Sequence, residues 1–84
     1  MNTRTLEDRK AEFTAAYHNT ARLASNINLW VTGEIWLHPS EESRKHLDAI
    51  SHFSKTIGDR NDNPNPFVLG MLWDAKKKYF DSLV

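Results

Sequence analysis

The four histidines of this chain are the side chains whose chemistry first suggests metal binding. They are His18, His38, His46 and His52. A helical zinc site typically takes His or Cys ligands about three or four residues apart. No two of these histidines have that spacing, and the chain contains no Cys. We therefore expect neither a metal site nor a cofactor.

An Asx-rich segment at residues 59–63 places oxygen ligands at alternate positions, as the start of a calcium loop does. The position where such a loop requires Gly is Pro64, and the position of its bidentate Glu is Gly70. We therefore interpret the segment as a helix connector whose side chains cap turns.

The sequence contains no recognisable catalytic motif. It has no Cys nucleophile and no G-x-S-x-G elbow, and its three glycines are isolated, so they form no phosphate-binding loop. The acidic residues fall at predicted helix starts or on predicted solvated faces. The sequence therefore predicts a protein that is not an enzyme.

Basic residues form another candidate site, for a nucleic acid or another anion. They are Arg44, Lys45, Lys76, Lys77 and Lys78. Eleven basic residues balance eleven acidic ones, so the chain has no net charge that would attract phosphate backbones. A solvated helix end explains the lysine run more simply, and a nucleic-acid-binding or transcription-related protein is the alternative hypothesis.

A third hypothesis is a binder of a small anionic ligand at an oligomer interface. Predicted helix N-termini near Ser40 and Asn65 could hold such an anion, together with lysines from a neighbouring copy. This hypothesis requires self-association.

Apolar residues in the first half of the chain recur with the spacing of a helix. This stripe consists of Phe13, Tyr17, Ala24, Ile27 and Val31, with Leu6 one heptad ahead. Apolar residues at such steps predict an amphipathic helix. The stripe continues without a slip, and we therefore expect one long helix that begins near Leu6 and runs toward the break at Pro39.

A short β-hairpin between residues 28 and 38 is the alternative for part of this stretch. Gly33-Glu34 stands between two apolar runs, and Gly at the first central position suits a two-residue turn. Asn26 and Asn28 also weaken a helix, because their side chains compete for the backbone. The unbroken apolar phase nevertheless favours the helix.

Two shorter helices follow, each with recognisable start signals. Ser40 caps a helix over Glu41–Ile57 that Gly58 ends, and Asn65-Pro66 begins a helix that runs to about Ser82. We therefore predict an all-α fold in a single domain, residues 1–84. Its architecture would be an antiparallel three-helix bundle of one long and two shorter helices, with α+β as the alternative.

Aromatic and large apolar side chains exceed what three short helices can bury. The residues that we expect to contact another protein are Leu29, Trp30, Trp36, Leu37, Trp73 and Phe80. Such side chains anchor interfaces as readily as cores. The sequence therefore predicts a small interaction module that docks on another protein as a regulator or inhibitor, of the kind that phages carry as accessory proteins. It is expected to self-associate as a homo-oligomer.

Localisation follows from three features of the composition. The N-terminal residues form no apolar leader, and no apolar stretch is long enough to span a bilayer. The absence of Cys is compatible with a reducing compartment. We expect a cytoplasmic protein that does not bind a membrane.

Overall fold

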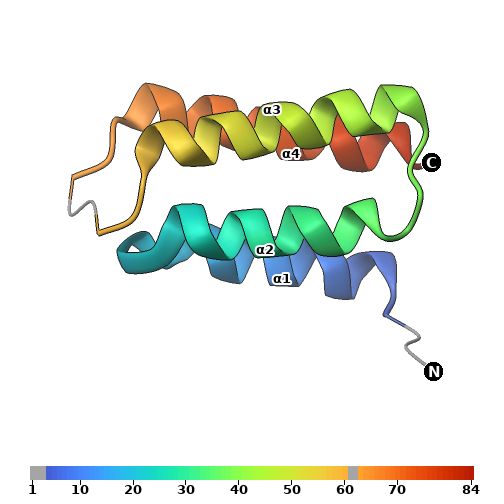
Figure 1. The fold of residues 1–84 in the computed structure, drawn as a ribbon, viewed down its shortest axis with the longest axis horizontal. Coiled ribbons are helices and arrows are strands. Elements are labelled where there is room, and N and C mark those ends of the chain that lie inside the picture. Colours follow the sequence, from blue (N-terminus) through green and yellow to red (C-terminus); the bar gives the residue numbers. More distant parts are fainter. Residues whose placement is uncertain (1–3, 61–62) are drawn as a thin grey trace.

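The computed structural model describes residues 4–60 and 63–84, and every regular element in this part of the chain is helical. The elements are α1 (Leu6–His18), the short 3-10 helix η1 (Thr20–Arg22), α2 (Leu23–Ile35), α3 (Glu41–Ile57) and α4 (Pro66–Ser82). The four α-helices alternate in direction along the long axis of the molecule (Figure 1). The all-α prediction is therefore confirmed. None of these helices is long and apolar enough to cross a bilayer.

The predicted single long helix in the first half is wrong, and so is the count of three helices. The chain leaves the helix at Asn19, passes through η1 and returns as α2. In one continuous helix Phe13 and Trp30 would be about 25 Å apart, whereas their ring centroids lie 5.1 Å apart. The apolar spacing did not reveal the turn, because a helix and a helical hairpin need the same apolar face. The hairpin lets the two halves of that face bury each other.

Residues 28–38 do not form the alternative β-hairpin. Helix α2 continues to Ile35, and the backbone N–H of Trp36 still donates to the carbonyl of Thr32 at 3.2 Å. The chain then reverses at His38, which has a φ of 55°. This left-handed backbone redirects the chain into Pro39 and the start of α3.

Helices α3 and α4 confirm the two shorter predicted helices and their caps. The Ser40 hydroxyl accepts from the backbone N–H of Ser43 at 3.2 Å, and the Asn65 side chain accepts from that of Phe67 at 2.8 Å. Gly58 ends α3 with a φ of 81°, a conformation that Gly adopts without a Cβ penalty. Local sequence therefore determines these ends.

The connection after α3 fastens the turn between α1 and α2. The Asp59 carboxylate accepts from the backbone N–H of Ser25 at 3.0 Å and from its hydroxyl at 2.5 Å. These hydrogen bonds hold the pKa of Asp59 below its ordinary value and cap the first turn of α2. Arg60 donates its backbone N–H to the carbonyl of Ala21 at 2.9 Å. The prediction of a turn-capping connector is thus confirmed for Asp59, and residues 61 and 62 lie outside the described residues.

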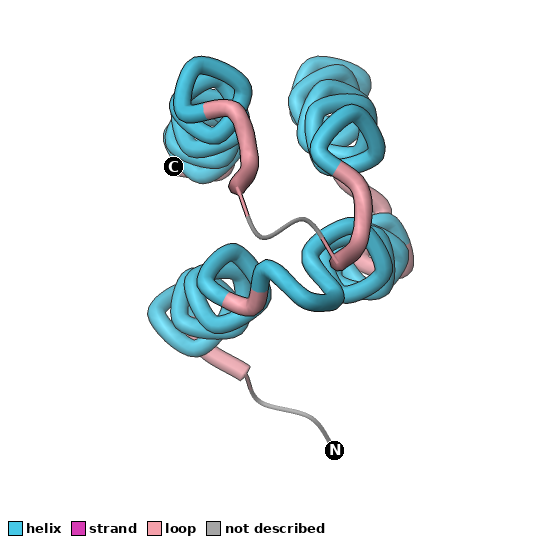
Figure 2. Tube along the Cα trace, turned by 90° about the vertical axis from the view of Figure 1, so that its left-hand side faces the viewer, coloured by secondary structure: helices cyan, strands magenta, loops and turns pink. Residues whose placement is uncertain are grey.

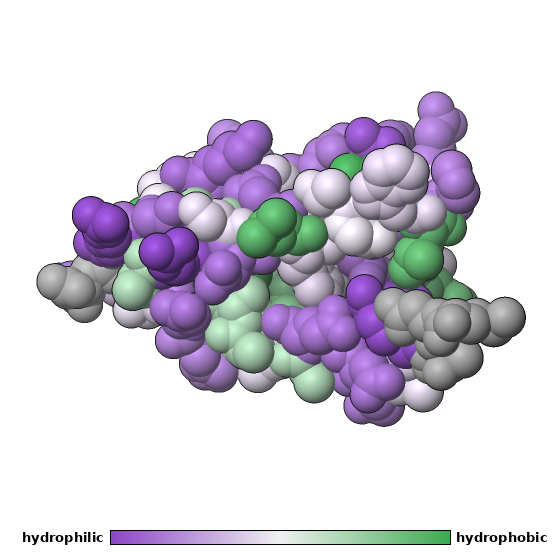
Figure 3. Space-filling model, turned by 60° about the horizontal axis from the view of Figure 1, so that its bottom comes forward, coloured by the Kyte–Doolittle hydropathy of each residue, from purple (hydrophilic) through white to green (hydrophobic). Residues whose placement is uncertain are grey.

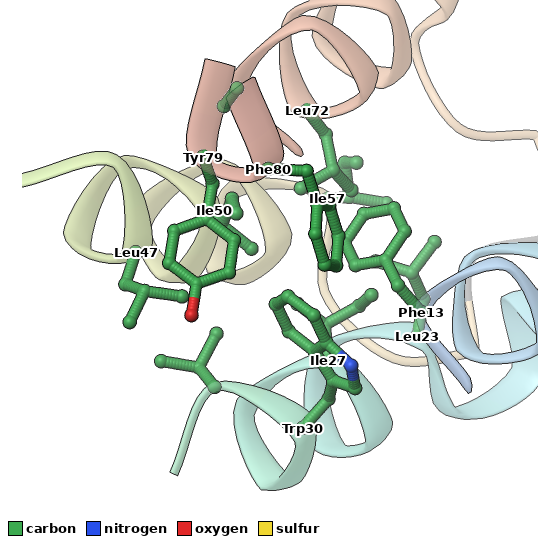
Figure 4. Close-up of a cluster of buried hydrophobic side chains, with 12 residues drawn as sticks. Phe13, Leu23, Ile27, Trp30, Leu47, Ile50, Ile57, Leu72, Tyr79 and Phe80 are labelled. Atoms are coloured by element: carbon green, nitrogen blue, oxygen red, sulfur yellow. The ribbon is translucent and has the colours of Figure 1, made fainter. Parts of the chain in front are cut away.

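One core lies between the helices (Figures 2 and 4). Its buried apolar members are Phe13, Leu23, Ile27, Trp30, Val31, Leu47, Ile50, Ile57, Leu72, Ala75, Tyr79 and Phe80. Each helix packs against the next one in the chain, whereas within the described residues no Cα atom of α1 lies within 8 Å of one in α4. Aromatic side chains bridge that wider separation, because Trp73 lies 4.9 Å from Tyr17 and 6.1 Å from Phe13 between ring centroids.

Candidate functional site

A charged cluster is buried where α1, α2 and α4 meet. The carboxylate of Glu34, which is fully buried, accepts two hydrogen bonds from Arg9 Nε at 3.1 Å and a short one from Arg9 Nη2. It also accepts from the Tyr79 hydroxyl at 2.6 Å and from Arg4 Nη2 at 3.4 Å. No local pattern in the sequence indicates this cluster, because Arg9 and Tyr79 alone are separated by seventy residues.

The cluster joins helices rather than presenting a reactive group. Hydrogen bonding to Glu34 raises the pKa of Arg9 above its ordinary value, against the effect of burial. Burial, then the hydrogen bond to Glu34, raises the pKa of the Tyr79 phenol. The Arg9 guanidinium therefore stays charged where it contacts the Glu34 side chain, and the Tyr79 phenol beside it stays neutral. Because the carboxylate has no exposed surface, its role in this structure is to hold the three helices in register.

Two of the six residues predicted to contact another protein are buried instead. Trp30 is 7% exposed and Phe80 is 4% exposed. The Trp30 indole N–H donates to the backbone carbonyl of Arg9 at 3.1 Å, so its polar atom is satisfied inside the core. These two residues therefore belong to the core and not to an interaction surface.

Three others of the six are exposed on the outer side of α2 and just after it. Leu29 is 71% exposed, Trp36 is 75% exposed and Leu37 is 55% exposed. We call these three residues the α2 patch. Leu29 and Trp36 stand seven residues apart and therefore project from nearly the same side of the helix. Figure 3, which turns the α1 and α2 side of the molecule forward, shows hydrophobic areas that are small and separated by hydrophilic ones.

A hollow of ≈370 Å³ lies beside Trp36. Its walls are Ile35, Trp36, His38, Pro39 and Arg44. Arg44 comes from α3 and also approaches Asp48, with 3.6 Å between Nε and Oδ1, in an exposed pair. Such an exposed pair is weakly held, so the guanidinium is able to turn toward a ligand in the hollow. The site thus combines an apolar surface with a positive charge.

The sixth predicted contact residue, Trp73, is half-buried between α1 and α4. Its ring contacts Tyr17 and Phe13 on one side, and the ammonium of Lys76 lies 3.8 Å from its centroid. Trp73 is therefore committed mainly to packing within the chain.

The five basic residues predicted to contact an anion do not form one surface. Arg44 borders the hollow at Trp36, and Lys45 is exposed on α3. Lys78 lines a groove between α3 and α4, whereas Lys76 and Lys77 line another between α1 and α4. A nucleic-acid backbone would therefore meet only a part of this set in any one orientation.

A second exposed apolar area, on α4, was missed from the sequence. Phe67 is 80% exposed and Met71 is 44% exposed. Met71 borders a groove of ≈370 Å³ together with Ala49 and Phe53 of α3. Phe67 and Met71 are four residues apart on α4, and this spacing could have indicated a shared face. It did not stand out, because that helix is apolar around most of its circumference.

The two helix N-termini considered for an anion lie at opposite ends of the bundle, since α3 and α4 are antiparallel (Figure 1). Each cap also has a partner within its own helix, Ser43 for Ser40 and Phe67 for Asn65. Among residues 4–60 and 63–84, no three His, Asp or Glu side chains gather as a metal site would require.

Comparison with protein-family models, with curated proteins and with solved structures finds no match to this chain.

Proposed function

We propose that this chain is a small protein-interaction module that docks on another protein through the α2 patch. The observation that carries the proposal is the 75% exposure of Trp36 beside the exposed Leu37. Tryptophan contributes more than most side chains to binding when a partner buries it, and Trp36 is the largest exposed side chain of the α2 patch. Docking alone is sufficient to make such a module a regulator or inhibitor, because it occupies a surface that its partner needs.

The hollow beside Trp36 indicates the chemistry of the partner. Ile35 and Pro39 supply apolar walls, and Arg44 supplies a positive charge at the rim. An apolar side chain that is followed or flanked by a carboxylate satisfies both features. We therefore expect the partner to present an apolar anchor next to Asp or Glu.

Site-directed photocrosslinking in the cells that naturally produce the chain tests this proposal. The photoreactive residue p-benzoylphenylalanine replaces Leu37, which leaves Trp36 in place, and a control chain carries it at the exposed Lys55 of α3. We expect a discrete adduct from position 37 that disappears in a Trp36→Ser background and is absent from position 55. The same adducts from both positions would overturn the proposal.

Reconstitution with the captured partner gives the quantitative arm. Trp36→Ser is expected to raise the dissociation constant by about thirtyfold, which is the usual effect of truncating a binding hot spot. Phe67→Ser, which removes an equally exposed aromatic side chain from α4, is expected to leave it unchanged. An adduct of two copies of this chain, with a mass in solution that falls on dilution, would instead assign the α2 patch to self-association and overturn docking on a foreign protein.

The nucleic-acid alternative has less structural support. Its candidate residues are distributed over several faces of the bundle, and the chain has no net charge. The docking proposal rests instead on three exposed apolar side chains of α2 and the residues directly after it.

A further inference from the structure

A groove between α1 and α4 brings together three lysines that the sequence separates. It encloses ≈330 Å³ and is lined by Lys10, Lys76, Lys77, Trp73, Phe80 and Asp81. Lys10 comes from α1 and the other lysines from α4. We call this hollow the lysine groove. It lies away from the α2 patch and shares no residue with it.

Two of the ammonium groups are held in place by aromatic rings. The Lys76 ammonium lies 3.8 Å from the centroid of Trp73, and that of Lys10 lies 5.6 Å from the centroid of Phe80. Trp73 is itself fixed by its contact with Tyr17. Cation–π contacts of this kind restrict a flexible lysine, so part of the entropic cost of binding is met before a ligand arrives.

Positive charge in the lysine groove is incompletely balanced. Within the described residues, neither Lys76 nor Lys77 forms an ion pair, and Lys10 has only a 3.7 Å contact with Glu7, whose side chain is 84% exposed. Burial, followed by repulsion from Lys10 and Lys77, lowers the pKa of Lys76. The residues that line the groove supply three ammonium groups and one carboxylate, Asp81, and Glu7 is the one further carboxylate that forms an ion pair with a groove lysine. Positive charge therefore remains in excess, and an anion would balance it.

The shape of the groove selects a compact anion over a nucleobase. Phe80 is 4% exposed, and Trp73 already carries Lys76 over its ring and Tyr17 beside it. Neither ring therefore offers a free face for a base to stack on, as single-stranded nucleic acids require. Lysine ammonium groups act as point charges that suit phosphoryl oxygens.

We propose that the lysine groove binds a compact phosphoryl oxyanion, either inorganic phosphate or the terminal phosphate of a small phosphorylated molecule. The oxyanion would lie between Lys10 of α1 and Lys76 and Lys77 of α4 and would bridge the two helices whose backbones are not in direct contact. Binding would therefore also stabilise the fold by mass action.

Titration followed by NMR at constant ionic strength tests the proposal, with the indole N–H signal of Trp73 as the reporter. The probes are inorganic phosphate, diphosphate and glycerol 3-phosphate, with chloride as the reference anion. We expect saturable shifts with the phosphates and none with chloride. The order of affinity among the three probes distinguishes free phosphate from a phosphorylated molecule.

A matched pair of variants separates a specific site from diffuse charge. Lys77 and Lys78 are adjacent and both exposed, but only Lys77 lines the lysine groove, whereas Lys78 lines the groove between α3 and α4. Lys77→Gln is expected to weaken phosphate binding by about tenfold, the loss of one charge-assisted hydrogen bond, and Lys78→Gln to leave it unchanged. Asp81→Asn is expected to strengthen binding, because it removes the one negative charge of the groove.

Two results would overturn the proposal. Shifts that grow without saturation would show that no site exists. Equal losses in Lys77→Gln and Lys78→Gln, accompanied by tighter binding of a single-stranded oligonucleotide than of any small phosphate, would instead show a diffuse polyanion surface. Both lysines are exposed, so the comparison does not depend on a variant that fails to fold.

Discussion

Glu34 and Trp36 stand two residues apart at the end of α2, and they differ in burial. The glutamate is fully buried, whereas the tryptophan is 75% exposed. Two residues apart on a helix project in directions about 200° apart, so only one of them can face the core. Here the charged residue faces inward and the largest apolar one faces solvent.

The difference between the two residues is in the partners that the chain supplies. Glu34 receives a guanidinium from Arg9 and a hydroxyl from Tyr79, which satisfy a carboxylate that would otherwise be costly to bury. The Trp36 indole has no hydrogen bond or ring contact with the described part of the chain. Partners therefore decide burial at this end of the bundle more than hydrophobicity does.

The largest expected effect comes from removing the buried charge. Glu34→Ala leaves Arg9 and Tyr79 without their acceptor, and we expect the free energy of unfolding to fall by about 3 kcal/mol. Urea denaturation followed by circular dichroism measures this loss. The matched control is Glu12→Ala, which removes another partner of Arg4 (3.1 Å) from a side chain that is 43% exposed. It is expected to cost less than about 1 kcal/mol.

An all-apolar replacement sharpens the same comparison. The triple variant Arg9→Met, Glu34→Leu, Tyr79→Phe removes three polar groups of the cluster together, and Arg4 keeps its ion pair with Glu12 at 3.1 Å. It is expected to be more stable than Glu34→Ala. Most of the stability that the single variant loses comes from buried polar groups left without a hydrogen-bond partner. A triple variant less stable than Glu34→Ala would show that the charged cluster itself stabilises the fold.

A smaller effect is expected from Tyr79→Phe, which deletes only the hydroxyl that donates to Glu34 at 2.6 Å. We expect a loss of about 1 kcal/mol at neutral pH. Because burial and this hydrogen bond raise the pKa of Tyr79 above its ordinary 10.0, its contribution is complete below the pKa of the unfolded tyrosine. The contribution is lost as the pH rises from there toward the folded pKa.

The alkaline part of this prediction has its own measurement. The denaturation midpoint is measured at about pH 8 and at about pH 11. Its fall between the two pH values should be smaller for Tyr79→Phe than for the unmodified chain. Tyr17 also has a raised pKa through burial, so phenolate absorbance of Tyr17→Phe identifies which tyrosine titrates. Equal midpoint changes in the two chains would contradict the assignment to Tyr79.

Local signals explain which parts of the fold could be predicted. The ends of α3 and α4 follow from Ser40, Gly58 and Asn65, whose effects reach only a few residues along the chain. The turn at Asn19 could not be predicted, because no Gly or Pro marks it and the apolar phase continues on both sides. Its stabilisation comes from Asp59 and Arg60, which are distant in sequence.

The candidate site was predictable to the same limited extent. The exposure of Trp36 and Leu37 agrees with their place next to a helix end before Pro39. The burial of Trp30 could not be separated from them by residue type, because it depends on a backbone carbonyl of α1 that accepts its indole N–H. The burial of Glu34 could not be predicted for the same reason, because its partners Arg9 and Tyr79 lie on two other helices.

The smallest expected effect on stability is that of Trp36→Ser, and it tests whether the α2 patch is free. An indole that is 75% exposed contributes little to the fold, so the free energy of unfolding should change by no more than about 0.5 kcal/mol. Trp30→Ser is the matched control, because it changes the same residue type on the same helix at a position that is 7% exposed. It is expected to cost about 3 to 5 kcal/mol. A loss above about 1 kcal/mol in Trp36→Ser would mean that the indole packs on its own chain in solution, and the α2 patch would then have no surface to offer a partner.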